Sequence, residues 1–181
     1  IAVAVGENGN VYVAGLSSNG SNNDFLTVAY DSAGNELWSQ VKDGVANNED
    51  HLYAIGVGAS GGVFVTGYSS NGANLDYLTV AYDSAGSELW SRVRNGGSSG
   101  DDAAYAMAMD ASGNLYVTGF SFNAGTNDYL TVAYDNAGNE LWARWKNLSW
   151  ESANAVSVDG SGHILVTGIT AGGVGYDFLT V

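Results

Sequence analysis

The stretch Asp24-Phe-Leu-Thr-Val-Ala-Tyr-Asp-Ser-Ala-Gly-Asn-Glu-Leu-Trp38 returns almost unchanged at residues 76–90 and 128–142, and its opening residues return once more from Asp177. The tryptophans that end these stretches, Trp38, Trp90 and Trp142, are separated by 52 and 52 residues. A glycine recurs with spacings of 52, 52 and 49, as Gly15, Gly67, Gly119 and Gly168. A repeat of about this length indicates a solenoid, a propeller or another array of stacked units.

The composition of the 181 residues favours strands over helices. The chain contains 26 Gly, 0 Pro and 0 Cys, with 45% hydrophobic residues, which suits apolar strands joined by many tight turns. The lack of Cys excludes disulfides, thiol catalysis and cysteine-ligated zinc. A formal charge of -14 disfavours nucleic acid and anionic membranes as partners. No apolar run reaches the length needed for membrane insertion. Because the chain opens on Ile1 without a Met, we expect a processed or truncated product.

Each repeat contains four strand-like segments. In the first repeat they are Ala2–Val5, Asn10–Leu16, Phe25–Tyr30 and Glu36–Lys42. The first segment returns at Tyr53–Val57, Tyr105–Met109 and Asn154–Val158, and the second at Gly62–Tyr68, Asn114–Phe120 and His163–Ile169. Between them lies a four-residue turn that ends in Gly9, Gly61, Gly113 or Gly162, where glycine can take the positive φ that closes an antiparallel hairpin. The second and third segments are apolar on both faces, so we expect both faces to be buried.

The fourth segment carries every basic residue of the chain, namely Lys42, Arg92, Arg94, Arg144 and Lys146. Each follows the repeat tryptophan by two or four positions, so strand alternation places it on the tryptophan face. Lys and Arg on an edge strand discourage edge-to-edge pairing. We therefore interpret the fourth segment as the outer strand of its sheet.

These features predict an all-β protein, a β-propeller built from four-stranded antiparallel blades of about 52 residues. The blades would be residues 1–52, 53–104 and 105–153, with a partial fourth blade at 154–181. The order of segments is clearest from Met107 to Asp135, where it resembles the bacterial SBBP β-propeller repeat. That resemblance covers the whole chain and implies a seven-bladed ring in a bacterial, secreted or surface-attached protein of unassigned activity. The segment that leads into each repeat tryptophan is also similar, more weakly, to the tryptophan corner of quinoprotein propeller blades.

Strand parity assigns the connections to two rims. One rim receives the short, nearly invariant turns, and the other receives the longer connections that are rich in Ser, Asn and Gly. Longer loops on a rigid scaffold commonly carry binding function, and these residues suit adaptable hydrogen bonds to a glycan or a protein. The candidate ligand-binding residues are Ser17, Asn19, Asn22, Ser69, Asn71, Asn74, Ser121, Asn123 and Asn127. The alternative is a solvated rim without a ligand.

The repeat tryptophans Trp38, Trp90 and Trp142 occupy one position of the blade, which favours packing between blades over a role as sugar platforms. Trp145 and Trp150 do not recur. They are better candidates for a local exposed contact, although packing is still the favoured interpretation.

The sequence gives only weak candidates for a metal site. Asp31, Asp83 and Asp135 each precede a Gly by three residues and a Glu by five, a pattern that could supply calcium ligands. The favoured interpretation is a type I turn that needs no metal. His51 and His163 lie at unrelated repeat positions and outside any nucleophile or metal motif, although acidic neighbours leave His51 open as a pH-sensitive or metal-binding spot. We expect no cofactor.

The sequence thus predicts a non-catalytic, extracellular or cell-surface binding or adhesion scaffold. The alternatives are a structural repeat that assembles by blade or strand complementation and, behind it, a fragment of a carbohydrate-active enzyme. Because three blades and part of a fourth leave open edges, we expect either a homo-oligomer, such as a dimer that closes one ring, or a piece of a longer chain.

Overall fold

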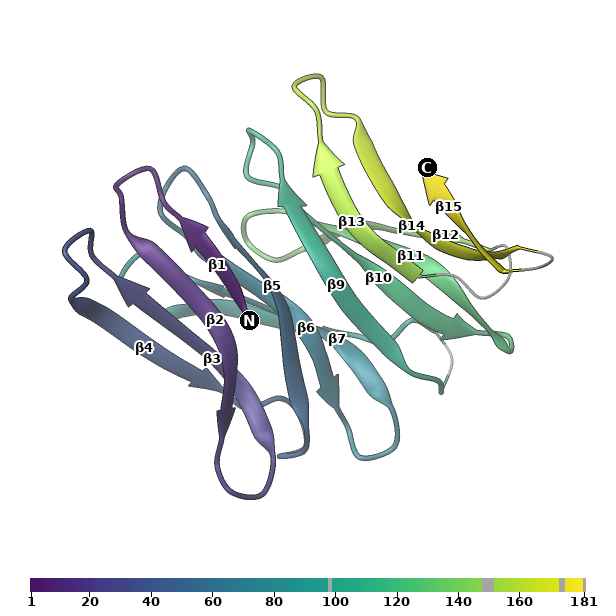
Figure 1. Cartoon of the computed structure of the whole chain (residues 1–181), viewed down its shortest axis with the longest axis horizontal. Coiled ribbons are helices and arrows are strands. Elements are labelled where there is room, and N and C mark those ends of the chain that lie inside the picture. The colour runs from purple at the N-terminus through teal and green to yellow at the C-terminus, as the bar shows by residue number, and fades with distance from the viewer. Residues whose placement is uncertain (98, 148–151, 173–174, 181) are drawn as a thin grey trace.

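The computed structural model describes residues 1–97, 99–147, 152–172 and 175–180. Its strands form four antiparallel sheets, and within each sheet the strands lie side by side in chain order (Figure 1). The first sheet contains β1 (Ala2–Val5), β2 (Val11–Ser18), β3 (Asn23–Tyr30) and β4 (Glu36–Lys42). The second contains β5 (Asp50–Val57), β6 (Val63–Ser70), β7 (Leu75–Tyr82) and β8 (Glu88–Arg94). The third contains β9 (Asp102–Met109), β10 (Leu115–Asn123), β11 (Thr126–Tyr134) and β12 (Glu140–Lys146), and the fourth β13 (Ser152–Val158), β14 (Ile164–Gly172) and β15 (Gly175–Thr180).

The predicted all-β fold and its repeated four-stranded antiparallel units are confirmed. Two sheets begin earlier than the predicted strands Tyr53–Val57 and Tyr105–Met109, because β5 starts at Asp50 and β9 at Asp102. The sequence pattern predicts connections over residues 43–52 and 95–104, so it places these extra residues outside the strands. They pair instead with the end of the next strand, as Asp50 does with Ser69 and Asp102 with Ser121. The connections at this end of the sheets are therefore shorter than expected.

The short turns follow from their glycines and aspartates. Gly9, Gly61, Gly113 and Gly162 all have positive φ, between 79° and 85°, and close the hairpins as predicted. The turn between β3 and β4 begins at Asp31. Its Oδ1 accepts hydrogen bonds from the backbone N–H groups of Ala33 and Asn35, both at 2.9 Å. Gly34 then takes a φ of 85°. The aspartate and the glycine together fix the turn.

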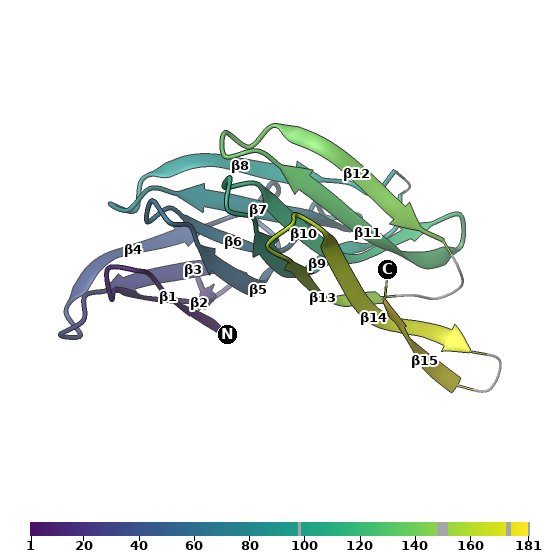
Figure 2. The ribbon, with the colours of Figure 1, turned by 90° about the horizontal axis from the view of Figure 1, so that it is seen from above.

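The four sheets are stacked one behind another along an arc (Figure 2). The strands β4, β8 and β12 lie on the convex side of that arc (Figure 2). Buried apolar side chains fill each space between neighbouring sheets. Tyr12 and Phe25 of the first sheet pack with Leu52, Val65 and Val80 of the second. Equivalent side chains pack between the second and third sheets and between the third and fourth. In the second and third sheets, burial on both faces explains why the second and third strands are continuously apolar. The expectation is wrong for the first sheet, where β2 and β3 bury one face only, because the other face has no neighbouring sheet.

The recurrent glycine of the second strand meets a bulge in the first strand. Between Leu52 and Ala54 the pairing of β5 with β6 shifts its register, and a Cβ added to Gly67 would lie 1.9 Å from the carbonyl oxygen of His51. Gly119 has the same relationship to Ala103, and Gly168 to Ser152. The close approach of two backbones leaves no space for a side chain, which is a usual reason for glycine within a strand.

The repeat tryptophans lie against the next sheet. The Nε1–H of Trp38 donates to the carbonyl oxygen of Ser84 at 3.1 Å, and that of Trp90 donates to Asn136 at 3.1 Å. Each indole lies between one aromatic ring of its own sheet and one of the next, Tyr12 and Tyr82 for Trp38. Trp142 contacts Tyr116 of its own sheet.

The predicted outer strands do lie at the sheet edges, but three of their basic side chains, those of Lys42, Arg92 and Arg94, reach the neighbouring sheet. Lys42 pairs with Glu88 at 3.0 Å and Arg94 with Glu140 at 2.9 Å. Exposed ion pairs of this kind contribute little to stability. They nevertheless show that these side chains extend along the stack, beyond the edge of their own strand.

Candidate functional site

The connections between strands emerge at two ends of the stack, as strand parity predicts. One end carries the turns β1–β2, β3–β4 and their counterparts. The other end, called here the long-connection rim, carries the described segments 19–22, 43–49, 71–74 and 124–125 and most of 95–101. The candidate ligand-binding residues lie in or beside these segments.

At the long-connection rim, asparagines join each hairpin to the segment that enters the next sheet. Asn22 Nδ2 donates to Asp24 Oδ1 at 3.1 Å and to the carbonyl oxygen of Asn48 at 2.6 Å. In the next repeat, Asn74 Nδ2 donates to the carbonyl oxygen of Gly100 at 2.6 Å. These amides therefore serve as bridges between sheets.

The candidate residues differ in how far they face solvent. Asn19 and Asn71 are exposed, Ser17, Asn74, Asn123 and Asn127 are half-buried, and Asn22 is buried. Asn19 and Asn71 also donate to Asp24 and Asp76, at 3.2 and 2.9 Å. Ser69 and Ser121 are fully buried, because the extended pairing of β5 and β9 places them under the connections at Gly44 and Gly96. A ligand-binding role does not suit these two serines.

Five aromatic side chains form a continuous group near this rim, on the first two strands of the second and third sheets. Their ring centroids are 4.6 to 6.0 Å apart, and the members are His51, Tyr53, Tyr68, Tyr105 and Phe120. Tyr53 is 38% exposed and the other four are half-buried. Partial burial raises the pKa of Tyr53, Tyr68 and Tyr105. All three phenols are therefore neutral near pH 7, able to donate and accept hydrogen bonds.

Sequence reasoning missed this aromatic group. Tyr53 and Tyr105 occupy the same repeat position, 52 residues apart, and that recurrence was a usable signal. The participation of His51, Tyr68 and Phe120 depends on how neighbouring strands are staggered, which the sequence pattern does not give.

A cleft of about 430 Å³ opens beside the aromatic group, between the second and third sheets. Its lining is Ala73, Asn74, Ser99, Gly100, Asp101, Phe120, Phe122 and Asn127. Phe120 belongs to both features, since its ring is 5.7 Å from that of Tyr105. Two of the predicted residues, Asn74 and Asn127, thus line a concave surface next to partly exposed aromatic rings.

Three carboxylates meet at the junction of the first and second sheets. One oxygen from each of Asp24, Asp43 and Asp50 lies within 4.8 Å of the other two. Asp24 and Asp50 are buried, and Asp43 is exposed. Burial raises the pKa of Asp50 above its usual range. In the described ranges this is the one group of three or more potential metal ligands that lie so close together.

The weak metal candidates Asp31, Asp83 and Asp135 lie elsewhere, one in each turn between the third and fourth strands. The carboxylate of Asp31 accepts from Asn35 Nδ2 at 2.8 Å in addition to its two backbone donors. The side-chain hydrogen bond from Asn35 lowers the pKa of Asp31. Asp83 and Asp135 hold their turns by the same backbone contacts. Such hydrogen bonds explain the recurrent aspartate by its own turn.

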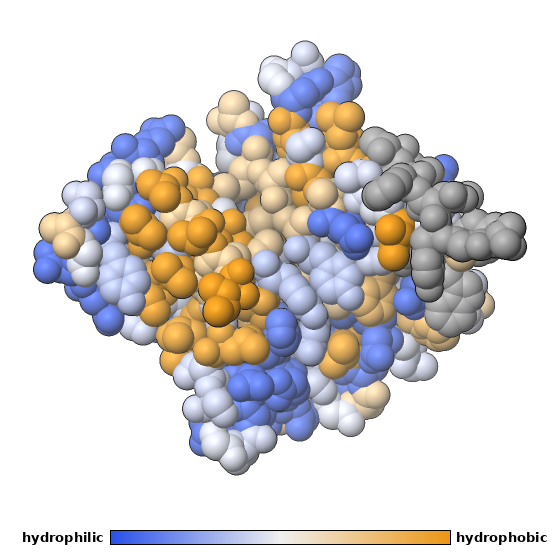
Figure 3. Space-filling model, viewed as in Figure 1, coloured by the Kyte–Doolittle hydropathy of each residue, from blue (hydrophilic) through white to orange (hydrophobic). Residues whose placement is uncertain are grey.

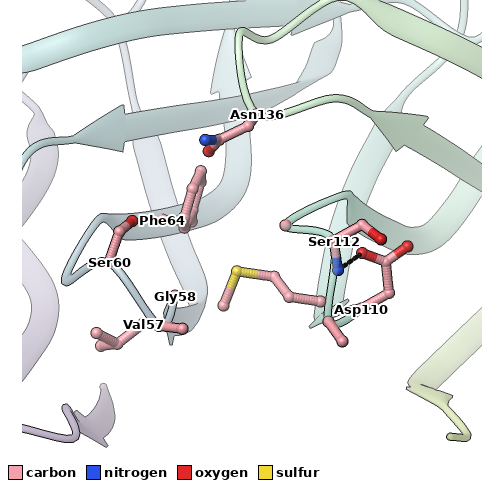
Figure 4. A pocket seen from close by; sticks show the side chains of 11 residues that line it. Val57, Gly58, Ser60, Phe64, Asp110, Ser112 and Asn136 are labelled. Carbon is pink, nitrogen blue, oxygen red and sulfur yellow. Dashed lines mark hydrogen bonds between the residues drawn. The ribbon is translucent and has the colours of Figure 1, made fainter.

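The opposite rim has a cavity of about 490 Å³ between the second and third sheets (Figure 4). Figure 4 shows Val57 and Phe64 on one side and Asp110 with Ser112 on the other. The carboxylate of Asp110 accepts from the backbone N–H of Ser112 at 2.9 Å, so it is part of its turn. The cavity is lined by small residues and by the apolar side chains of Val57, Phe64 and Met109, and its described lining brings no group of reactive side chains together.

The remaining residues singled out from the sequence have local roles. The ring of His51 stacks with Tyr68 at 5.7 Å. His163 Nδ1 contacts Asp159 Oδ2 at 2.8 Å, and this hydrogen bond lowers the pKa of Asp159 to about 2. Trp145 is 37% exposed, with the Arg94 guanidinium 5.5 Å from its ring centroid, whereas Trp150 lies outside the described residues.

Comparison with models of known protein families and with curated protein sequences found no match for this chain. In the described ranges, no helix is long and apolar enough to cross a membrane.

Proposed function

We propose that the chain is a set of β-propeller blades and acts as a non-catalytic binding scaffold, secreted or at the cell surface, whose long-connection rim binds a glycan. The resemblance to the SBBP repeat supports the propeller, and so does the stack of antiparallel sheets, in which the second and third sheets are packed on both faces by their neighbours. Neither a nucleic acid nor a lipid bilayer suits a chain with a formal charge of -14.

The observation that carries the binding proposal is the continuity between the aromatic group and the cleft. Tyr53 and Tyr105 meet edge to face at 4.9 Å, and Tyr105 leads through Phe120 into the cleft. Aromatic faces offer apolar contact at a small entropic cost, and neighbouring amides offer adaptable hydrogen bonds. A neutral, hydroxyl-rich chain such as a glycan uses both kinds of contact.

The same lining favours binding over catalysis. Asp101 is the one carboxylate among the described residues that line the cleft. Glycoside hydrolysis generally requires two carboxyl groups that flank the scissile bond. A carbohydrate-active enzyme would need a second acid at this cleft.

Binding is tested by titrating the purified chain with neutral oligosaccharides, and by probing a glycan array with the wild type and two variants. We expect wild-type binding to be weakened at least about tenfold by Tyr105→Ala, which corresponds to roughly 1.4 kcal/mol. Tyr30→Ala is the matched control, because Tyr30 is the last residue of β3 and lies at the end of that strand away from the long-connection rim. Absence of any glycan binding by the folded wild type, or equal effects of the two variants, would contradict the proposal. If the chain instead binds a protein, and Tyr105→Ala weakens that binding, the ligand of the rim is a protein and not a glycan.

A second candidate function is assembly by blade complementation, and the exposed face of the first sheet favours it. Val3 and Val5 are 65% and 66% exposed, while Ile55 and Val57 at the same positions of the second sheet pack against the core. Figure 3 shows apolar side chains gathered over β1 and β2. Such a face is suited to another blade of the same kind, supplied by a second copy of the chain.

A further inference from the structure

The carboxylates of Asp24, Asp43 and Asp50 come from both sides of a sheet junction. Asp24 lies on β3 of the first sheet, Asp43 directly follows β4, and Asp50 begins β5 of the second sheet. One oxygen from each lies within 4.8 Å of the others. Three like charges at this distance repel one another unless a proton or a cation lies between them.

Asp50 provides an independent observation at this junction, because one oxygen of its buried carboxyl group accepts no hydrogen bond. Its side chain is fully buried. Oδ2 accepts from the backbone N–H of Gly44 at 2.6 Å, but Oδ1 has no hydrogen-bond partner. The hydroxyl of Ser69 lies beside this carboxyl group without meeting hydrogen-bond geometry to Oδ1. A buried carboxylate oxygen without a partner is costly and calls for an explanation.

Protein cations do not supply that partner. Among the described residues, the Lys and Arg side chains that form ion pairs do so with Glu88 and Glu140. Asp24 is contacted by neutral amides, from Asn19 at 3.2 Å and Asn22 at 3.1 Å. The junction therefore gathers oxygen atoms and amides around three acids, and no described Lys or Arg side chain forms an ion pair with them.

We infer that this junction binds a calcium ion, held by the carboxylates of Asp24, Asp43 and Asp50. Ca²⁺ prefers oxygen ligands in a flexible arrangement of roughly six to eight, some of them water. Mg²⁺ requires a stricter octahedron and releases its water reluctantly. The exposed Asp43 gives the ion access from solvent. The bound ion would join the first sheet to the second at the point where the chain passes between them.

The next repeat contains a natural comparison. Asp76 and Asp102 occupy the positions of Asp24 and Asp50, but Asn95 replaces Asp43. Asp102 is also fully buried, its Oδ2 accepts from the N–H of Gly96 at 2.6 Å, and its Oδ1, like that of Asp50, has no hydrogen-bond partner. The two junctions thus share a backbone arrangement and differ by one charge. Asp43→Asn gives the first junction the residue of the second, and Asn95→Asp does the reverse. Each variant therefore carries a side chain that already occurs at that repeat position.

The inference is tested by titrating the metal-free chain with CaCl₂ in about 150 mM salt, which screens nonspecific attraction. Isothermal titration calorimetry should give one Ca²⁺ per chain for the wild type, none for Asp43→Asn and two for Asn95→Asp. At a Ca²⁺ concentration about a hundredfold above Kd, the Tm of the wild type should rise by roughly 5–10 °C, and that of Asp43→Asn should not change.

Asp83→Asn removes the same charge from an exposed turn and serves as the matched control, so it should bind one ion as the wild type does. The inference is overturned if the wild type shows no saturable binding, if Asp43→Asn still binds an ion, or if Asp83→Asn loses it. It is also overturned if Asn95→Asp gains no ion, or if Mg²⁺ reproduces the full shift in Tm. Because Asn occurs naturally at the equivalent position, Asp43→Asn is expected to fold.

Discussion

The indole of Trp38 lies so close to Gly86 of the next sheet that a Cβ added to this glycine would be 2.7 Å from ring atoms Cγ and Cδ2. Trp90 stands in the same relationship to Gly138, with the nearest ring atom at 2.5 Å. Gly34 occupies the same repeat position in the first sheet, and no atom lies within 4 Å of the position its Cβ would take. Gly34 is therefore a control for Gly86 and Gly138, because it has the same repeat position without an indole packed against it.

Gly86→Ala should be more destabilising than Gly34→Ala by about 1–3 kcal/mol, the usual cost of forcing extra atoms into a packed interior. Both glycines have a φ of 85°, so the backbone cost of alanine is the same in the two variants and cancels in the comparison. Urea unfolding followed by circular dichroism measures the difference. Equal losses of stability in Gly86→Ala and Gly34→Ala would show that the Trp38 indole can shift away from residue 86 without an energetic cost.

Trp90→Ala should lower the free energy of unfolding by roughly 3–5 kcal/mol, because it empties a buried space between two sheets and removes the hydrogen bond to Asn136. Trp142→Ala should cost clearly less, since Trp142 is only half-buried and contacts Tyr116 of its own sheet. Ser70→Ala, at the long-connection rim, should change stability by less than about 0.5 kcal/mol. Similar small effects at both tryptophans would mean that the indoles contribute little to sheet stacking, and would favour their alternative role as sugar platforms.

Gly67→Ala should destabilise the protein severely, by about 3 kcal/mol or more, because its Cβ would meet the backbone of β5 and not a flexible side chain. Gly15→Ala is the matched control at the same repeat position, where the nearest atom is Ile1 Cγ1 at an ordinary 3.5 Å. Thermal unfolding of the two variants provides the comparison. Comparable Tm values would indicate that the bulge in β5 relaxes easily.

Asp102→Asn should stabilise the protein near neutral pH, measured with a chelator present. Burial raises the pKa of Asp102 above its usual range. A carboxyl group with a raised folded pKa favours the folded state fully below its unfolded pKa, and this contribution is lost as the pH rises through the folded pKa. The amide keeps an acceptor for Gly96 and has no charge to bury. The advantage of the variant should therefore shrink as the pH falls toward about 3.5, and an advantage independent of pH would argue against the raised pKa.

Val3→Asn combined with Val5→Asn should weaken self-association if a second copy covers the first sheet. We expect the wild type to form a dimer in light scattering at micromolar concentration and the variant to form a monomer. Val45→Asn is a suitable control, because Val45 is 56% exposed on the connection after β4 and not on the open face. A wild-type monomer that stays soluble and unfolds cooperatively would rule out the shared ring.

The order and pairing of the strands were predictable from the sequence because period-2 alternation and turn glycines act locally. Glu36–Lys42 was predicted as a strand and is β4 with the same limits. The turn aspartates such as Asp31 were likewise interpretable from their neighbours, since their hydrogen bonds span at most four residues. A repeat makes such local signals stronger, because each is seen several times.

The sequence by itself determined that this protein is a tandem array of four-stranded antiparallel units, since hydrophobic alternation and turn chemistry depend only on near neighbours in the chain. Only the tertiary structure decided that Ser69 and Ser121 are buried, that Tyr53, Tyr105 and Phe120 lead into one cleft, and that Asp24, Asp43 and Asp50 meet. Alternation tells which face of a strand a side chain occupies. The stagger and twist of one sheet against the next decide what that face meets, and they arise from the packing of the whole stack.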